Sequence, residues 1–168
     1  MASLDLVALW EAHCRCEFET RDVDATMETM VSEPYVNHIP TMAGGVGHDQ
    51  LKRFYKYHFI GVNPPDFRLT PISRTVGADC LVDEFIVHFT HTTEIDWLLP
   101  GIPPTGRVVE VPTVAIVKSE GYKLLMSTSI GTRLRYSCRS GYSIQRISPW
   151  RVPKRHTKSW IKAAQVTS

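Results

Sequence analysis

The 168-residue sequence lacks the long apolar run that a membrane-spanning helix requires, because no stretch of about 18 apolar residues occurs in it. Its start, MASLDLVALWEAH, has acidic residues early and no basic segment before an apolar block, so we expect no secretory signal. It also lacks the GxSxG motif of α/β-hydrolases and the GK[ST] and GxGxxG loops that bind phosphate. We therefore expect a cytoplasmic protein with no membrane partner.

Cysteines are few, and they lack the paired spacing of metal sites. The four are Cys14, Cys16, Cys80 and Cys138. A single Cys-Arg-Cys segment is a weak metal signal, and reduced thiols are the usual state in the cytosol. We expect four free thiols and no metal.

Acidic residues are missing from the end of the chain. Residues 125–168 contain nine Lys and Arg and no Asp or Glu, whereas residues 1–124 contain 10 Lys and Arg against 17 Asp and Glu. A basic tail can bind nucleic acid. However, the tail, which includes Trp150 and Trp160, matches no RNA-binding module, so we expect no nucleic-acid partner.

The clearest structural signal lies in residues 81–118, where two runs rich in Val, Ile, Phe and Thr flank the Pro- and Gly-rich segment 100–106. This pattern predicts two long strands joined by a structured loop. In the first strand, odd-numbered positions 81–91 share one face and even-numbered positions 82–90 share the other. Both faces are mostly apolar and both carry ionisable groups. A sheet with helices on one side and a cavity lined by a few polar groups fits this pattern.

The rest of the chain predicts helices before strands. We expect helices over residues 4–18, 23–30 and 48–59, a short strand over 33–40, a flexible glycine-rich loop over 43–47 and a strand over 67–76. Asp22 is the expected N-cap of the second helix, and Pro71 predicts an edge position or a bulge for the last strand. Helices followed by antiparallel strands indicate one α+β domain.

Three segments resemble the SnoaL-like polyketide cyclases of the nuclear-transport-factor-two-like superfamily: Tyr35 to His38, Gly47 to Leu51, and Ile102 to Arg107. The resemblance runs from Trp10 to about Leu124. It implies a cone-shaped, curved antiparallel sheet with the N-terminal helices on its concave side, a homodimer formed through the sheet, and no metal or organic cofactor. It also implies a cyclase or isomerase of secondary metabolism that acts on a polyketide-derived, enolisable small molecule.

The sequence departs from that family after Leu124. The family carries a segment close to HEHIYWDQASVLVQ there. Residues 125–134 can be encoded by the codons CTC ATG AGC ACA TCT ATT GGG ACC AGG CTT. Read from the last base of the first codon, the same bases give CAT GAG CAC ATC TAT TGG GAC CAG GCT. This second reading encodes HEHIYWDQA. Our hypothesis is that residues from about Leu125 onward are read out of frame, which sequencing the transcript across the Leu124 codon would decide. The domain would then be residues 1–124, incomplete, followed by a basic tail, 125–168, that is disordered or poorly packed and cannot supply the last strand.

A cofactor-free cyclase needs a base for an acidic proton and donors for the enolate oxygen in a dry pocket. His38 matches the family's short-strand residue that faces the cavity, although a lone histidine is as often a hydrogen-bonded structural residue. Glu84 lies among apolar neighbours, so we expect a pocket acid or a partner for Arg53, Arg74 or Arg107. His91 corresponds to a histidine near the pocket rim in related sequences. His88 points to the other face, so at most one of the two histidines lines the cavity.

Four further residues are candidates for binding the substrate. Asn37 lies beside His38 and could donate a hydrogen bond, and Tyr55 belongs to the aromatic face of the helix over residues 48–59. Asp96 and Trp97 lie in the loop after the long strand, where the tryptophan could cap a planar substrate or pack in the core.

Two other functions stay open. The family's acid/base aspartate lies in the alternative frame, so this chain lacks it, which favours a non-catalytic ligand-binding or dimerisation module. A lactone hydrolase of the carboxymethylenebutenolidase type, or an epoxide hydrolase, could use the same cavity, but no cysteine matches the nucleophile of dienelactone hydrolases.

Overall fold

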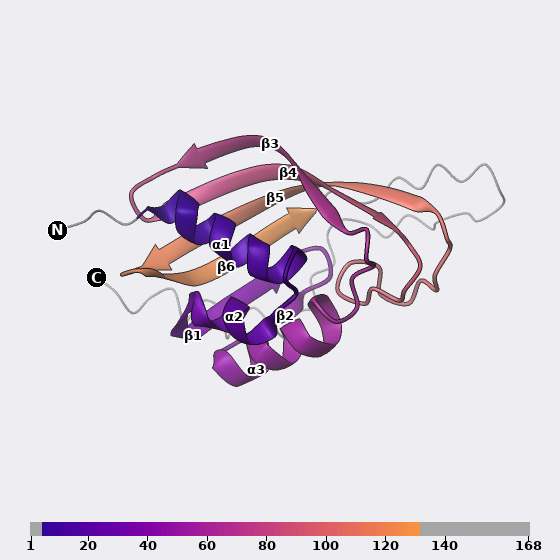
Figure 1. Ribbon diagram of the computed structural model, residues 1–168, viewed down its shortest axis with the longest axis horizontal. Coiled ribbons are helices and arrows are strands. Elements are labelled where there is room, and N and C mark those ends of the chain that lie inside the picture. The colour runs from indigo at the N-terminus through magenta and orange to yellow at the C-terminus, as the bar shows by residue number, and fades with distance from the viewer. Residues whose placement is uncertain (1–4, 132–168) are drawn as a thin grey trace, which may run out of the picture. The chain divides into compact units, whose positions relative to one another are not determined.

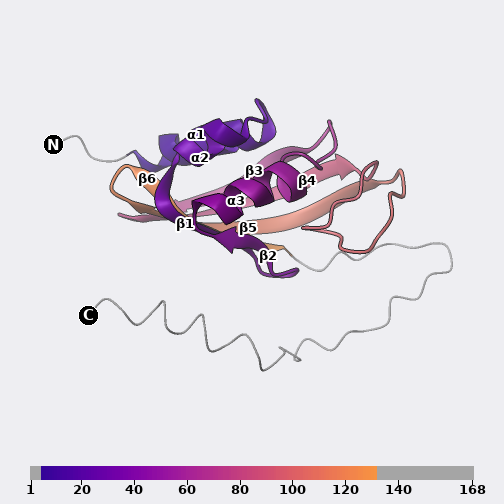
Figure 2. The same ribbon diagram turned by 90° about the horizontal axis from the view of Figure 1, so that it is seen from below.

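Helices cover one side of a sheet in this protein. A computed structural model describes residues 5–131, in which the helices are α1 (Leu6–Phe18), α2 (Val23–Glu28) and α3 (His48–Phe54). A π-helical turn, η1 (Tyr55–Phe59), continues α3. Figures 1 and 2 show α1, α2 and α3 on the same side of the curved sheet. Within these residues, no helix combines the length and the apolar character needed to cross a membrane.

The sheet has six strands within the described residues. In chain order they are β1 (Met30–His38), β2 (Ala43–Val46), β3 (Arg68–Val76), β4 (Cys80–Thr90), β5 (Val108–Glu120) and β6 (Lys123–Gly131). Their order across the sheet is β2-β1-β6-β5-β4-β3. Neighbouring strands are antiparallel except β1 and β6, which run parallel. The predicted α+β class is confirmed, and the sheet differs from a fully antiparallel one in this single pair.

Local sequence explains where the first helices begin. The side chain of Asp5 accepts a hydrogen bond from the Ala8 amide at 2.9 Å, and that of Asp22 accepts one from the Ala25 amide at 3.0 Å. Both are N-caps that satisfy an amide left without a helical partner. The predicted cap at Asp22 is therefore confirmed.

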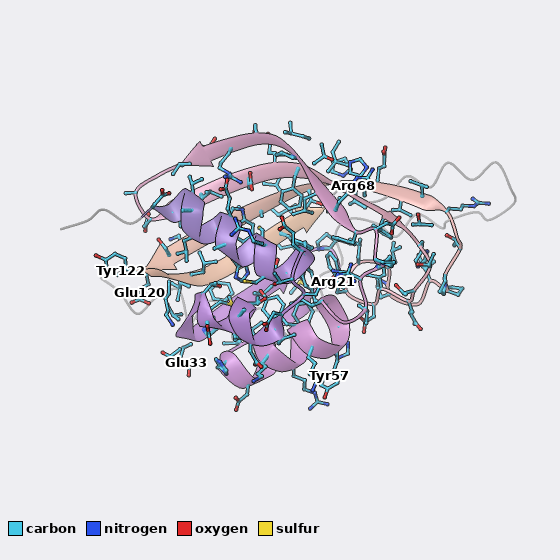
Figure 3. All side chains as sticks on the ribbon, in the orientation of Figure 1. Arg21, Glu33, Tyr57, Arg68, Glu120 and Tyr122 are labelled. Atoms are coloured by element: carbon cyan, nitrogen blue, oxygen red, sulfur yellow. The ribbon has the colours of Figure 1, made fainter. Side chains whose placement is uncertain are left out.

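Strand β4 has the alternation that the sequence predicts. Its odd-numbered positions from Leu81 to Phe89 are buried under the helices, and its even-numbered positions are half-buried or exposed. The prediction for β3 is also confirmed, since it is an edge strand whose register shifts between Pro71 and Ser73. Side chains fill the space between the helices and the sheet, whereas Tyr57 and Tyr122 lie at the surface (Figure 3).

The segment predicted as a flexible glycine-rich loop is instead strand β2, which pairs antiparallel with β1. Glycine is required there, because Gly44 has φ +137° and an added Cβ would lie 2.0 Å from the carbonyl oxygen of Val36. The prediction was wrong because the sequence Ala-Gly-Gly-Val has little intrinsic strand preference and forms a strand only by pairing with β1.

The prediction that residues after Leu124 cannot supply a strand is wrong for residues 125–131. Strand β6 continues through Leu124 to Gly131 and pairs with both β1 and β5. Backbone hydrogen bonds do not depend on the side chains, so a strand rich in Ser and Thr can still complete a sheet. The predicted domain boundary thus falls inside β6, and the predicted disorder of residues 132–168 lies outside the described residues.

Candidate functional site

A small cavity lies between the helices and the sheet, with a volume of about 50 Å³. Most of its lining is aromatic or aliphatic. The hydroxyl, carboxyl and imidazole groups in the lining belong to Glu17, His38, Tyr55, Thr113, Ser127 and Ser129. An apolar cavity with a few converging polar groups is the usual form of a small-molecule site.

Strand β1 positions His38 in this cavity. The ring centroid of His38 lies 4.6 Å from that of Trp97 and 5.4 Å from that of Phe59. Its Nδ1 shares a hydrogen bond with Ser129 Oγ, and its buried Nε2 has no partner among residues 5–131. Burial lowers the pKa of His38 to about 3. The imidazole is therefore neutral at physiological pH and has one nitrogen free for a ligand.

This burial makes stability depend on pH. The unfolded imidazole gains a proton below its ordinary pKa of 6.5, whereas folded His38 stays neutral down to about pH 3. Stability is thus full above pH 6.5 and falls as the pH drops toward 3. Between pH 7 and pH 5, the free energy of unfolding, measured with urea, should fall by about 2 kcal/mol in the wild type. This loss should be absent from the variant His38→Phe, which has no imidazole at this position. The exposed His48→Phe should keep the wild-type loss, and equal losses in all three proteins would contradict this expectation.

Helix α1 supplies the second polar group. Its buried positions are Leu6, Trp10, His13 and Glu17, which recur at intervals of four, three and four residues on one helix face. Glu17 lies at the cavity with 6% of its surface exposed. Its Oε1 is 3.0 Å from Nε2 of His13, which is itself fully buried.

Tyr55 extends this polar group from η1. Its hydroxyl is 3.4 Å from Nε2 of His13. Burial raises the pKa of Tyr55 well above its ordinary value, and the charge of Glu17 and a hydrogen bond with Glu17 raise it further. The tyrosine therefore stays protonated, so it can donate a hydrogen bond to the carboxylate or the imidazole.

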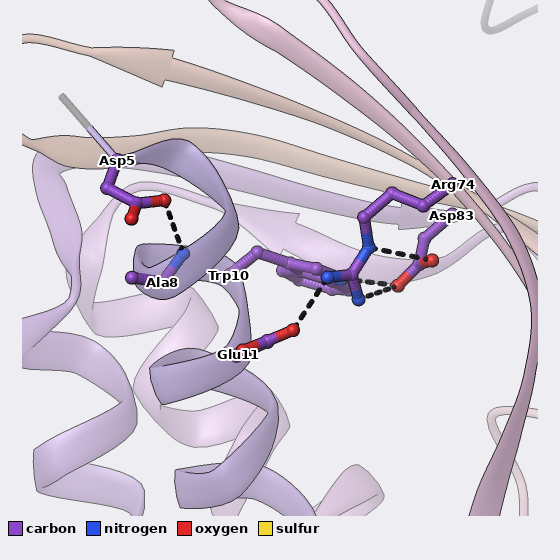
Figure 4. A network of polar contacts seen from close by, with 6 residues as sticks. All are labelled: Asp5, Ala8, Trp10, Glu11, Arg74 and Asp83. Carbon is purple, nitrogen blue, oxygen red and sulfur yellow. Dashed lines mark hydrogen bonds and ion pairs between the residues drawn. The ribbon is translucent and has the colours of Figure 1, made fainter. Parts of the chain in front are cut away.

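A buried carboxylate fixes α1 over the sheet (Figure 4). Asp83 of β4 accepts hydrogen bonds from Trp10 Nε1 at 2.8 Å and from Arg74 Nη2 at 2.9 Å and Nε at 3.1 Å. Arg74 also donates to Glu11 on α1 at 2.8 Å. These bonds join α1 to β3 and β4, and they hold the helix that presents Glu17.

Two of the three predicted catalytic residues lie outside the cavity. Glu84 is exposed on the opposite face of β4, where it accepts a hydrogen bond from Ser73, and Arg74 pairs with Asp83 instead. Glu84 does not line the cavity, because strand alternation turns Asp83 and not Glu84 toward the helices. Of the three partners predicted for it, Arg53, Arg74 and Arg107, Arg74 pairs with Asp83.

The predicted pocket histidine His91 is fully buried at the end of β4, but it does not line the cavity. Its Nδ1 is 3.3 Å from Oγ1 of Thr105, and its main chain bonds to Arg107, Thr105 and Gly106. Burial lowers the pKa of His91. His88 lies on the opposite face, 3.1 Å from Glu110, so neither histidine lines the cavity. His91 thus organises the loop before β5.

Of the four residues predicted to bind the substrate, two line the cavity and two do not. Tyr55 and Trp97 line the cavity, and Trp97 donates to Asn63 Oδ1 at 3.0 Å. Asn37 is on the other face of β1 from His38, and Asp96 is exposed and pairs with His58 at 2.6 Å. Asn37 and Asp96 therefore do not line the cavity, since adjacent strand residues face opposite ways and the loop turns the aspartate outward.

Glu17 and His13 were not among the site residues predicted from the sequence. By apolarity alone, Leu6, Leu9, Trp10 and Cys14 form one stripe of the first helix. The buried face is rotated from that stripe, because it includes two polar residues at its C-terminal end. The spacing from Leu6 to Glu17 was the available signal, and apolarity alone could not reveal it.

A larger groove adjoins the cavity, with a volume of about 460 Å³ between α1 and the strands β3 and β4. The two spaces share four lining residues, Phe18, Phe67, Leu69 and Phe85. The rings of Phe18 and Phe67 stack with centroids 5.4 Å apart. These shared side chains separate the cavity from the groove. In residues 5–131, no three His, Cys, Asp or Glu side chains gather in a way that could hold a metal ion.

Comparisons with known proteins agree with this fold. A protein from Shewanella putrefaciens CN-32 described as a SnoaL-like polyketide cyclase has a TM-score of 0.61 at 14% identity, over 73% of this chain and 77% of that chain. Another so described, from Jannaschia sp. CCS1, has a TM-score of 0.56 at 20% identity, over 75% of this chain and 86% of that chain. A protein of Catenulispora acidiphila DSM 44928 with a ketosteroid isomerase-like fold has a TM-score of 0.55 at 12% identity, over 76% and 85%.

No curated protein matches the chain in sequence. These structural likenesses, all at low identity, establish the fold. The sequence profile of the SnoaL-like domain matches residues 10–124, which include most of α1, strand β1 with His38, and most of the sheet. The chain therefore belongs to the SnoaL-like domain family.

Proposed function

We propose that this protein is a cytoplasmic enzyme of secondary metabolism that moves a proton on a carbon skeleton, without a cofactor, as a cyclase or isomerase. The observation that carries the proposal is a mostly apolar cavity whose lining includes a buried carboxyl group, Glu17, and His38, whose Nε2 has no partner among residues 5–131. Apolar surroundings strengthen the interactions of both groups with a developing charge.

In the proposed reaction, the carboxylate of Glu17 takes a proton from the carbon beside a carbonyl group. The electron pair of the broken C–H bond forms the C=C bond of an enolate, and the negative charge moves to oxygen. Return of the proton to another carbon completes an isomerisation. Attack of the enolate carbon on a second carbonyl, whose oxygen then takes the proton, completes an aldol cyclisation.

His38 is the proposed donor to the enolate oxygen. When the Ser129 hydroxyl donates to Nδ1, the single ring proton of the neutral imidazole lies on Nε2, the atom that has no partner in the described part of the chain. A neutral imidazole can stabilise an enolate oxygen by donating a hydrogen bond without transferring its proton.

The size of the cavity limits the substrate. A volume of about 50 Å³ admits only a few non-hydrogen atoms, whereas typical ligand sites have about 300–1,000 Å³. A polyketide-derived substrate therefore requires rotation of Phe18 or Phe67, which would join the cavity to the groove of about 460 Å³. We propose that the bulk of the substrate lies in the groove and its enolisable carbon at Glu17.

Proton exchange tests this function without the natural substrate. Pentane-2,4-dione and a cyclic 1,3-diketone, incubated with the protein in D₂O, should exchange their α-protons faster than in buffer, as measured by proton NMR. The variant Phe18→Ala should accept the cyclic ketone more readily, because it removes part of the wall. Exchange at the buffer rate with both ketones and both proteins would end the proposal.

The small volume also favours a second function, a non-catalytic ligand-binding module. In that case the diketones would perturb the resonances of cavity residues without any gain in exchange rate. The two functions are thus separated by one pair of NMR measurements.

We also propose that the protein is a homodimer formed through the sheet face that the helices leave open. This face carries Val82, Ile86, Val114 and Ile116 in neighbouring positions of β4 and β5, and the adjoining Ile130 of β6 is 41% exposed. Apolar patches of this kind often mark association surfaces.

Light scattering after size exclusion should therefore give twice the chain mass for the wild type and one chain mass for Val114→Glu. That substitution places a charge in the patch directly opposite Glu84. Thr92→Glu, in the exposed loop after β4, should remain dimeric. A monomeric wild type would refute the dimer.

A further inference from the structure

His13 is fully buried on α1, yet the reaction proposed above gives it no part. Three polar groups surround its ring. Nδ1 is 2.6 Å from Thr29 Oγ1, while Nε2 is 3.0 Å from Glu17 Oε1 and 3.4 Å from the Tyr55 hydroxyl. The ring of Trp10 stacks on it, with centroids 5.5 Å apart. Both nitrogens of His13 are thus held in fixed directions.

The hydroxyl of Thr29 determines where His13 carries a proton. That hydroxyl lies 2.7 Å from the carbonyl oxygen of Thr26, which can only accept a hydrogen bond. The single proton of the hydroxyl is therefore directed to Thr26, and its oxygen can only accept from Nδ1. It follows that Nδ1 of His13 carries a proton in every protonation state of the site.

The same reasoning applies to the other side of the ring. With Nδ1 protonated, a proton on Nε2 makes His13 a cation beside an ionised Glu17. Without that proton, Nε2 is an acceptor, and the carboxyl group must carry the proton that joins them at 3.0 Å. In both arrangements one proton lies between Nε2 and Glu17, and the pair is neutral overall, which avoids an unpaired buried charge.

The groups that face this pair do not change that balance at neutral pH. Burial raises the pKa of Tyr55 on η1 and of Cys14 on α1, so both stay uncharged. Asp83 of β4 is paired with Arg74 of β3. Among residues 5–131, this leaves only Glu17 and His13 to exchange the proton.

We propose that His13 is a positioning residue that keeps one oxygen of Glu17 in place and holds one proton jointly with it. This inference rests on Glu17 as the proposed base. When the ionised carboxylate takes a proton from the substrate, the pair gains one positive charge, and this charge balances the negative charge of the enolate formed beside it. His13 does not touch the substrate, because it does not line the cavity.

Nitrogen-15 NMR of the imidazole tests this arrangement independently of any activity. In the wild type, Nδ1 of His13 should have the shift of a protonated nitrogen. In Glu17→Gln, Nδ1 should be unchanged, whereas Nε2 should move to the shift of an unprotonated nitrogen because the shared proton is lost. An unprotonated Nδ1 in the wild type, or an unchanged Nε2 in the variant, would overturn the inference.

Two substitutions separate positioning from packing. His13→Gln keeps an amide that can reach Glu17, whereas His13→Asn keeps only an amide that can reach Thr29. We expect the kcat of α-proton exchange to fall by roughly tenfold in the glutamine variant and by roughly 100-fold or more in the asparagine variant. The KM should change little in either variant. Equal losses in both folded variants would show a purely structural role. Absence of exchange in the wild type would refute the proposed function but leave the NMR result to judge the shared proton.

Discussion

Glu17→Gln is expected to slow α-proton exchange of a β-diketone by roughly 10²- to 10⁴-fold, the usual contribution of a general base. Glutamine preserves the shape of the side chain and can still hydrogen-bond to His13, but it cannot accept a proton from carbon. Initial exchange rates in D₂O, measured by proton NMR at equal concentrations of folded protein, give the comparison.

Glu28→Gln is the matched control for this experiment. Glu28 is the last residue of α2, is exposed, and lines neither the cavity nor the groove. Its neutralisation should leave the exchange rate within about twofold, since a screened surface charge contributes little. If Glu17→Gln also keeps the wild-type rate, Glu17 is not the base.

Asp83→Ala is expected to lower the free energy of unfolding by about 3–5 kcal/mol. The substitution removes the acceptor of three hydrogen bonds, leaving Trp10 Nε1 buried without that partner and Arg74 with Glu11 alone. The buried N–H and the guanidinium then lose interactions that water replaces only in part. Urea unfolding followed by tryptophan fluorescence measures the change.

Glu84→Ala provides the contrast, because Glu84 is the next residue of β4 and is exposed on the other face. Its loss should change stability by no more than about 0.5 kcal/mol, as for most surface positions. A loss from Asp83→Ala that is no larger than this would mean that the network in Figure 4 does not hold α1 on the sheet.

The same two residues explain one limit of prediction from sequence. Alternation correctly separates Asp83 from Glu84 and His91 from His88, and it follows from strand geometry alone. Which face meets the helices depends on apolar content, and both faces of β4 are largely apolar. Glu84 and His91 lie on opposite faces, so they could never both have lined one cavity.

Helix α1 shows a second limit. Its extent and N-terminal region could be predicted from periodicity, but the buried face includes the polar residues His13 and Glu17. Their burial depends on Thr29 and Tyr55, which come from other elements and supply the hydrogen bonds that offset the loss of water. A pattern within one helix cannot reveal partners that only the fold brings near.

Strands β2 and β6 show a third limit, because both form by pairing and not by side-chain preference. The out-of-frame reading of residues from about Leu125 onward stays a prediction. The end of the family match at residue 124 agrees with it, and β6 shows that the residues that follow can still pair through their backbone.

The position of β6 has a consequence for how the protein is made. It is the last strand of the described chain to leave the ribosome, yet it lies between β1 and β5 and pairs with both. Until it emerges, the hairpin of β1 and β2 and the meander of β3 to β5 have no strand in common, and the nascent chain holds two separate half-sheets with open edges. A decoding error at the start of β6 would therefore act on assembly during translation, before any chemistry can be affected.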